Sequence, residues 1–405
     1  MLLQLIVILA ATRLFAWLAG RVGQAEVIGE MVAGILLGPS LLGYFAPDVF
    51  SYVFAASNVP VFATIAELGL ILLMFQIGLD FELSAVTTAK RTVALVSLLG
   101  IVVPFGLGAW TSMYFYDALP EPRPEALSFV LIFAVSMSIT ALPVLARIFM
   151  ETGLAKHRAG TIAIAAAALN DVVGWLLLGA VSLLIAGSFS VTWVAVRAAG
   201  IVAVCGAAFY VVRPLVRRYM TGHLVRRGQL VHSGISVVLV LLFAFAYATN
   251  ELGLHALIGG FILGVALHQH TAFVTEWKSR IAPLVNGLLL PIFFAHTGLR
   301  TDVGSLGGGD EVLQAGLICG IAFLGKYGGA YLGARFAGER HRMAHVLAVS
   351  MNTRGLMELV VLNIGYDLGI LSRVLFTQLV YMAVITTLIA TPLIRRFLKS
   401  EPAST

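Results

Sequence analysis

Long apolar runs follow one another along nearly the whole chain and are separated by short polar loops. A helix needs about 20 mostly apolar residues to cross the hydrocarbon core of a bilayer. By this measure the sequence predicts about thirteen membrane-spanning helices. They are expected approximately over residues 2–20, 27–43, 62–81, 92–115, 127–149, 160–187, 191–212, 232–249, 254–270, 281–299, 312–335, 344–366 and 374–394.

The composition supports this interpretation. The 405-residue chain is 60% hydrophobic and 11% charged, and its mean hydropathy is +0.97. A soluble domain is about half apolar and about a quarter charged, so a soluble enzyme, a disordered chain and a coiled coil are excluded. The net charge of +6 does not indicate a nucleic-acid partner, because the basic residues lie mostly between the apolar runs. We therefore expect an all-α polytopic protein in a lipid bilayer, with no cofactor.

The distribution of lysine and arginine predicts the orientation, because short cytoplasmic loops collect these residues. Nineteen of the 26 lie in odd-numbered loops or at the C-terminus, whereas three lie in even-numbered loops. The N-terminus is therefore expected outside and the C-terminus in the cytoplasm, in the plasma (inner) membrane. The opening MLLQLIVILA lacks the features of a cleaved signal peptide. Residues 1–405 are expected to form one transmembrane transporter domain with no soluble C-terminal regulatory domain.

Three pairs of segments look alike across the two halves of the chain. They are IGEMVAGILLG (28–38) with IGGFILGVALH (258–268), LMFQIGLD (73–80) with FFAHTGLR (293–300), and VSMSITALPVL (135–145) with VSMNTRGLMEL (349–359). Each pair joins expected helices seven apart, and an odd difference means opposite orientation in the bilayer. Inverted repeats are typical of alternating-access transporters, whose sites lie near the midplane where helices break. We expect repeat one over about 27–187, a linker helix over about 191–212 and repeat two over about 254–394.

Ionisable residues at membrane depth are costly, so each is a candidate for function. Six stand out: Glu30, Glu67, Asp171, Lys326, Arg354 and Glu358. Asp171 is the strongest candidate, because it lies about eleven residues into its apolar run, in AAAALNDVVGW. A carboxylate in a wet, partly desolvated cavity can hold either a proton or a bare cation, but not both. That competition is the minimum chemistry for ion exchange.

Two segments are apt for helix breaks. Pro143 in SMSITALPVL frees the carbonyl group near residue 139, and the paired segment contains NTRG at residues 352–355. Broken helices expose carbonyl oxygens that coordinate cations, and Ser138 and Thr140 add side-chain oxygens beside this break.

The other charged candidates each allow two roles. Lys326 lies among glycines that permit close helix approach, and it can neutralise a buried carboxylate or lose its proton when a cation arrives. Arg354 and Glu358, four residues apart, either pair along one helix or act in function. Glu67 and Glu30 either line vestibules or seal helix ends.

The sequence resembles the monovalent cation:proton antiporter superfamily at SITALPVLARI, AAAALNDVVGW and SMNTRGLMELVVLNIGYDLGILS. Within it, the second branch and its plant-type cation/H⁺ exchangers, with their bacterial relatives, are the most similar. The resemblance implies thirteen helices, a dimerisation panel, and a core panel whose fifth and twelfth helices break and cross. It also implies a homodimer. Asp171 would be the shared proton and cation site, with Asn170, Thr140 and Ser138 beside it and Lys326 at the family's basic position.

Departures from the family pattern qualify the site. Asn170–Asp171 replaces the two adjacent aspartates of electrogenic sodium members, which favours one proton per cation unless Lys326 carries a second. Ala141 and Ala166 stand where members of the other major branch have acidic residues, so a sodium site copied from them is not expected. Plant-type exchangers are mostly associated with potassium, so potassium is favoured and sodium is the alternative. Ligand-gated potassium efflux relatives carry a C-terminal nucleotide-binding domain, and no such domain is expected in this chain.

The resulting hypothesis is an antiporter that exchanges a monovalent cation for H⁺ by alternating access, with the cation held at Asp171 and Thr140. Three alternatives remain at this stage: a cation channel of the same family, an organic-anion/sodium symporter on a similar inverted-repeat fold, and an intramembrane enzyme. Paired aspartates, a His-metal cluster and a Ser-Lys dyad in facing helices are missing from the sequence, which counts against the enzyme. Cation-linked proton flux distinguishes the antiporter from the first two.

Overall fold

The fold is taken from a computed structural model of the chain. It describes residues 1–39, 41–54, 59–81, 89–117, 119, 123–185, 190–219, 225–226, 229–230, 232–253, 256–299 and 309–399. Part of the polar stretch expected as a loop between the helices of 281–299 and 312–335 lies outside these residues.

The described residues are almost all helical. The helices are α1 (Leu2–Arg21), α2 (Glu26–Leu37), α3 (Leu42–Phe45), α4 (Pro47–Val53), α5 (Val59–Leu79), α7 (Lys90–Asp117), α8 (Ala126–Ser138), α9 (Leu142–Glu151), α10 (Arg158–Ile185), α11 (Val191–Gly206), η2 (Ala207–Val212), α12 (Arg213–Tyr219), α13 (His232–Glu251), α14 (Ala256–Leu267), α15 (Thr271–Arg280), α16 (Ala282–Leu284), η4 (Val285–Leu289), α17 (Leu290–Leu299), α18 (Gly309–Phe336), α19 (His341–Ser350), α20 (Leu356–Asp367) and α21 (Arg373–Lys399). A short antiparallel hairpin joins β1 (Val225–Arg226) to β2 (Gln229–Leu230), pairing Val225 with Leu230.

The protein is an all-helical polytopic membrane protein. Ten helices of the described chain are long and apolar enough to cross a membrane, or eleven when the bent pair Thr271–Arg280 and Ala282–His296 is taken as one span. Two shorter apolar helices, Ala256–Leu267 and Met357–Tyr366, fall below this length. The expected helix at 344–366 is divided between α19 and α20, so neither piece reaches the ~20 residues of a continuous span.

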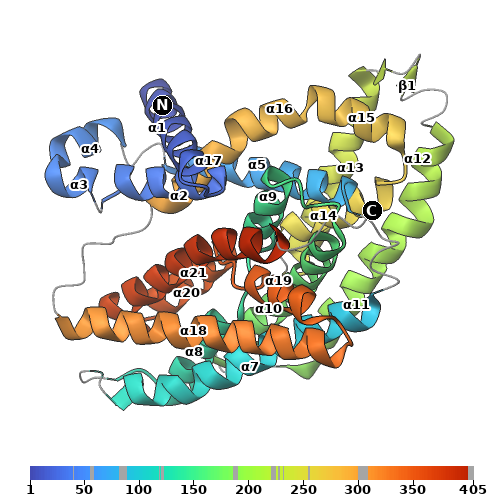
Figure 1. Cartoon of the computed structure of the whole chain (residues 1–405). Helices are drawn as coiled ribbons and strands as arrows, with labels where there is room; N and C mark the ends of the chain where they lie inside the picture. The colour runs from blue at the N-terminus through green and yellow to red at the C-terminus, as the bar shows by residue number, and fades with distance from the viewer. Residues whose placement is uncertain are drawn as a thin grey trace.

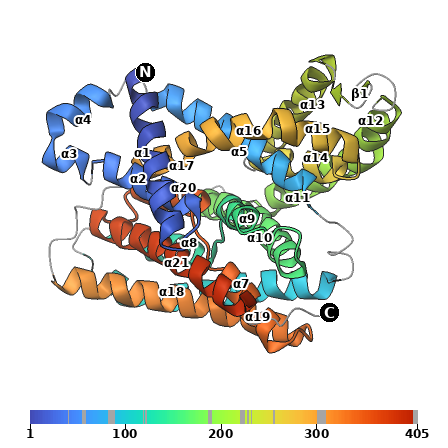
Figure 2. The ribbon, with the colours of Figure 1, turned by 45° about the horizontal axis from the view of Figure 1, so that its top comes forward.

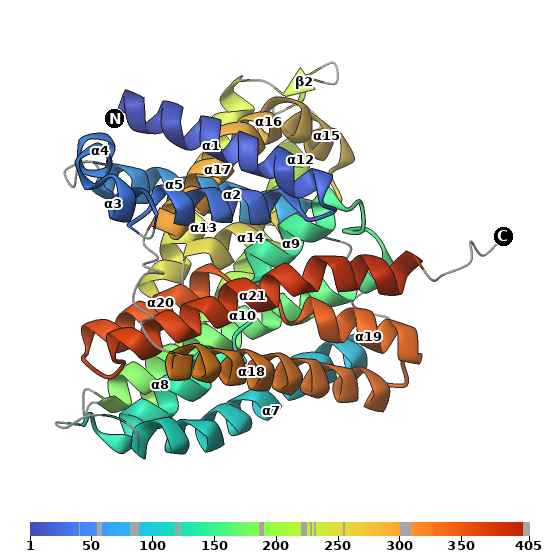
Figure 3. The same ribbon diagram turned by 60° about the vertical axis from the view of Figure 1, so that its left-hand side comes forward.

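The helices form two groups (Figures 1, 2 and 3). The first group contains α1, α2, α5 and α13–α17, in which α2 packs against α1 and α17, and α5 against α14 and α17. The second group contains α7–α10 and α18–α21, with α7 against α8, α10 and α18, and α18 also against α19 and α21. The α11–α12 segment connects α10 of the second group to α13 of the first.

Close helix contact holds α18 against α7 in the second group. A Cβ atom at Gly329 would lie 2.2 Å from the carbonyl oxygen of Leu99, and one at Gly333 would lie 2.4 Å from that of Leu95. Both distances are too short for any side chain. The expectation that the glycines around Lys326 permit close approach to a neighbouring helix is therefore confirmed.

Both expected helix breaks are present, and they meet. The first separates α8, which ends at Ser138, from α9, which begins at Leu142. Pro143 lies in the first turn of α9, where its missing N–H is tolerated because that turn has no intrahelical acceptor. The second break separates α19 from α20. The Ala141 amide donates to the Thr353 carbonyl at 2.9 Å, joining the two breaks directly.

Candidate ion-binding site

The two breaks cross beside the middle of α10. The Thr140 hydroxyl donates to the Met351 carbonyl at 2.9 Å, and the Asn170 side-chain amide donates to Thr140 Oγ1 at 3.3 Å. Ser97 on α7 in turn donates to Asn170 Oδ1 at 2.5 Å. This chain of hydrogen bonds fixes the orientation of Asn170 and ties α7, α10 and both breaks together.

Asp171 follows Asn170 and is buried, with 6% of its surface exposed. Its carboxylate interacts with the backbone amide of Leu142 and with the charge of Lys326. Leu142 begins α9, so the carboxylate lies at a helix N-terminus, where the helix dipole favours negative charge. Asp171 Oδ1 nevertheless has no hydrogen-bond partner among the described residues. This oxygen is therefore available to a proton or a cation.

A second unpaired oxygen lies in the other break. Asn352 donates its side-chain amide to the Ala348 carbonyl at 3.0 Å, but its Oδ1 is buried without a partner among the described residues. A buried polar oxygen without a donor is costly and therefore calls for a ligand or an ordered water. These two oxygens come from α10 and from the α19–α20 break, and Glu358 Oε2 of α20 is a further buried oxygen without a partner among the described residues.

Two cationic side chains cover the opposite end of the first break, at the C-terminus of α8. Lys326 of α18 is fully buried and donates to the Ser138 carbonyl. Arg354 donates to the carbonyls of Ser136 and Met137, each at 2.8 Å. The last carbonyls of a helix have no intrahelical partner and carry partial negative charge. Lys326 and Arg354 therefore satisfy them and stabilise a helix end that is buried in the protein.

Arg354 also pairs with Glu358. Arg354 Nη1 lies 3.3 Å from Glu358 Oε1, and both side chains have 0% exposure. The backbone around Arg354 is held by α21, because its amide donates to Thr387 Oγ1 at 2.8 Å and its carbonyl accepts from the same hydroxyl at 3.1 Å. The pairing considered from the sequence is therefore present, and it links α20 to α8.

The structure places most of the predicted residues together. Asp171, Asn170, Thr140, Lys326, Arg354 and Glu358 all lie at the crossing or contact its helix ends. Ser138 contributes its carbonyl to Lys326, whereas its hydroxyl donates to Val135 of its own helix at 2.9 Å. Glu67 lies elsewhere, with an exposed side chain on α5 of the first group.

Sequence reasoning did not single out Ser97, Thr387 or the Met351 carbonyl. Ser97 and Thr387 are polar residues within apolar helices, which is a weak signal because such residues commonly bond to their own helix. A carbonyl contact has no sequence signal at all, because every residue carries one. Their roles follow from the crossing itself.

Comparisons with known proteins identify the family of the chain. The family described as sodium/hydrogen exchanger, transmembrane, matches residues 6–400. The Na(+)/H(+) antiporter NhaS4 of Synechocystis sp. is 36% identical over 400 residues, covering 97% of this chain and 96% of the relative. Cation/H(+) antiporter 17 of Arabidopsis thaliana is 35% identical, covering 97% of this chain and 48% of the relative. K(+)/H(+) antiporter 1 of Saccharomyces cerevisiae is 31% identical, with coverages of 91% and 43%. The chain thus spans about half the length of the plant relative and less of the yeast one.

A solved structure has the same fold. The sodium proton antiporter MjNhaP1 from Methanocaldococcus jannaschii matches with a TM-score of 0.66 over 98% of this chain and 97% of that chain. The sequence identity is 15%. At this identity the similarity extends to the fold alone.

Proposed function

Since the chain belongs to the transmembrane sodium/hydrogen exchanger family, we propose that it exchanges a monovalent cation for H⁺ at one shared site centred on Asp171. The chain is a cation/proton antiporter of the second branch of its superfamily and is a transporter, not an enzyme. The resemblance inferred from its motifs is thereby confirmed. The site, the preferred cation and the transport cycle are the proposal.

The observation that carries the proposal is the unpaired oxygen of Asp171 at the crossing of two broken helices. A buried carboxylate with a free oxygen needs a positive ligand, and a proton and a bare cation each supply one positive charge. Thr140 Oγ1, Asn352 Oδ1 and the carbonyls freed by the breaks offer oxygens to replace part of the hydration shell of the cation. Asn170, oriented by Ser97, positions Thr140.

Competition for Asp171 gives the coupling. The second helix group would move relative to the first and expose Asp171 to each side of the membrane in turn. The protonated and cation-bound forms have equal charge, whereas the empty ionised form leaves a bare carboxylate in a dry barrier and is too costly to move. One cation then exchanges for one proton, unless Lys326 also releases a proton when the cation binds.

Potassium is the favoured cation and sodium the alternative. The yeast relative is named as a K(+)/H(+) antiporter and the cyanobacterial one as a Na(+)/H(+) antiporter, so the names alone support both. The plant-type resemblance of the crossing segments is what favours potassium.

The proposal includes thirteen spans in two inverted repeats. The ten long spans, the bent pair, α14 and the broken α19–α20 together correspond to the thirteen apolar runs. In these repeats α2 corresponds to α14 and α5 corresponds to α17. The contact of α2 with α17 then has its counterpart in the contact of α14 with α5, as a two-fold repeat requires. We further propose a homodimer in the plasma membrane, with the N-terminus outside and the C-terminus cytoplasmic.

The test is proton flux in liposomes that contain a pH dye and an inward-acid gradient. Potassium or sodium is added separately, with and without a voltage clamp. We expect potassium to drive proton movement that is insensitive to the clamp. Asp171→Asn is expected to reduce this flux to the level of protein-free liposomes, whereas Asp310→Asn, at the exposed start of α18, leaves it unchanged.

Three outcomes would overturn parts of the proposal. Normal exchange by Asp171→Asn would remove Asp171 from the shared site. Cation flux without any linked proton movement would favour the channel interpretation, and clamp-sensitive exchange would make Lys326 a second proton carrier.

A further inference from the structure

A second buried acidic group lies outside the crossing, at the interface of the two helix groups. Glu30 of α2 has 0% exposure, and neither of its carboxylate oxygens has a hydrogen-bond partner among the described residues. Its neighbour Gly29 is pressed against α1, where an added Cβ atom would lie 2.2 Å from the Phe15 carbonyl. The α1–α2 packing therefore leaves Glu30 enclosed.

Glu30 interacts electrostatically with α9 of the second group. The groups that act on it there are Arg147 and Glu151, and Arg13 of α1 and Glu26 of α2 add weaker effects. The Arg147 guanidinium is already engaged, because its Nε donates to Glu151 Oε1 at 2.6 Å. The helix α17 also packs on α2, where the backbone of Ala295 lies against Gly34, one turn beyond Glu30. The residue after Ala295 is His296, a further titratable group on this side of α2.

The charges of the enclosed groups do not balance. Glu30 and Arg147 are buried, and the Glu151 side chain is 13% exposed. With all three ionised, the set carries a net charge of −1. A buried carboxylate without donors costs several kcal/mol. One added proton on Glu30 makes the set neutral and removes that cost.

This region is also where the two groups hold together. Glu151 Oε2 accepts from the Glu26 amide at 2.6 Å and so caps α2 from the other group. Close by in the chain, Arg395 donates to the Gly23 carbonyl at 2.6 Å and Gln24 donates to the Leu388 carbonyl at 3.1 Å. These bonds link the α1–α2 turn to α9 and α21, which belong to the second group.

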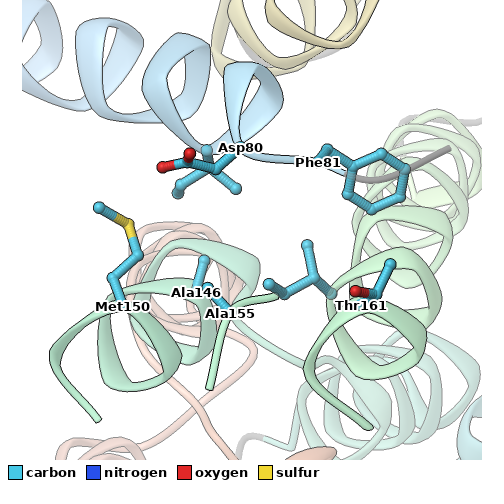
Figure 4. A pocket seen from close by; sticks show the side chains of 8 residues that line it. Asp80, Phe81, Ala146, Met150, Ala155 and Thr161 are labelled. Carbon is cyan, nitrogen blue, oxygen red and sulfur yellow. The ribbon is translucent and has the colours of Figure 1, made fainter. Parts of the chain in front are cut away.

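The same interface is incompletely filled next to α9. Figure 4 shows Asp80 and Phe81, after the end of α5, facing Ala146 and Met150 of α9 and Thr161 of α10 across a small cavity. Asp80 is paired with Lys278 of α15 within the first group. The contact between the groups here combines apolar packing of α9 on α2 and α5 with the polar bonds at Glu151 and a small unfilled space.

We propose that Glu30 is a second proton-binding site, which is protonated while α9 is docked on α2 and releases its proton when the two groups separate. The inference rests on the alternating-access movement proposed above. The proton comes from water at the α1–α2 turn and returns to it, so it is not transported. Glu30 thereby makes the rate of exchange depend on the pH at that side of the membrane, independently of Asp171.

Transport by matched variants tests this role. Glu30→Gln is expected to keep cation-dependent proton flux. The midpoint of its profile of exchange rate against the pH at one side of the membrane should shift by at least about one pH unit. Asp310→Asn, at the exposed start of α18 and outside this set of charges, should follow the unmodified protein. Glu30→Asp, which keeps a carboxyl group, should retain the pH dependence. Superimposable pH profiles for Glu30→Gln and the unmodified protein would overturn the proposal.

A direct measurement separates this inference from the proposed function. Infrared spectra of Asp171→Asn and of Asp171→Asn with Glu30→Gln are compared over a pH series. We expect a band of a protonated buried carboxyl group in the first that is missing from the second. Identical spectra would show that Glu30 holds no proton. If Asp171→Asn still exchanged ions, the proposed function would fail while this measurement still reported on Glu30.

Discussion

Two fully buried glutamates, Glu358 at the crossing and Glu30 at the interface of the helix groups, are treated differently by the fold. Glu358 pairs with Arg354, one turn away, and Arg354 also donates to the Ser136 carbonyl near the end of α8. The Glu358 side chain is therefore part of a contact that joins α20 to α8. Glu30 faces an arginine that is committed to another carboxylate. The difference indicates that one charge holds the second group together, whereas the other responds to the position of that group.

The largest expected effect is a difference in stability between the same substitution, glutamate to glutamine, made at each of these two residues. Glu358→Gln leaves Arg354 buried without its countercharge and is expected to lower the free energy of unfolding by about 3 kcal/mol. Glu30→Gln replaces a group that is already protonated with one of the same shape, so a change below about 1 kcal/mol is expected. Thermal unfolding in detergent measures both. Equal losses would show that Glu30 also holds a paired charge.

A contact at the crossing gives an intermediate effect. Gly355 lies against α9, and an added Cβ atom would be 2.8 Å from Val144 Cγ2. Gly355→Ala places a methyl group in this contact. We expect a loss of about 1–3 kcal/mol and slower exchange, because the breaks are forced apart.

Gly328→Ala is the matched control for that change. It lies on α18, two residues after Lys326, with open space around the added Cβ atom. Its unfolding temperature and exchange rate should remain near those of the unmodified protein. If both alanine variants lost activity equally, the crossing would not depend on the close approach of Gly355.

The smallest expected effect concerns a third carboxylate, Glu339, which follows α18. Arg158 donates to both of its oxygens, at 2.8 and 2.7 Å, and Thr92 donates to Oε1 at 2.8 Å. The hydrogen bonds from Arg158, aided by Thr92 and opposed by burial, hold the pKa of Glu339 below its ordinary value of 4.5. A lowered pKa stabilises the fold above pH 4.5, and this contribution is lost as the pH falls through the lowered value.

Glu339→Gln tests this sign. Arg158 is about half exposed, so solvent screens the pair and the expected loss near neutral pH is about 1 kcal/mol or less. The difference in unfolding temperature between the unmodified protein and the variant should shrink as the pH falls below 4.5. A difference that grew toward low pH would contradict the assignment.

Much of the crossing was predictable from sequence because its members are conspicuous. A charge in an apolar run, such as Asp171 or Lys326, has few structural explanations. Pro143 marked the first break because it lacks an amide hydrogen. The partners of these residues were not predictable in the same way. Ser97 reaches Asn170 only because α7 packs against α10, and the Ser138 carbonyl reaches Lys326 only because α8 ends there.

The sequence by itself determined the membrane environment, the helical class and the family, because these depend on composition and on motifs that are local in the chain. Tertiary structure alone decided which charges are paired. Arg354, four residues before Glu358, made that pair one of two possibilities in the sequence, whereas nothing in the sequence of α2 indicates whether Glu30 is paired. The distinction depends on where Arg147 and Arg354 direct their guanidinium groups, which is set by contacts between helices far apart in the sequence.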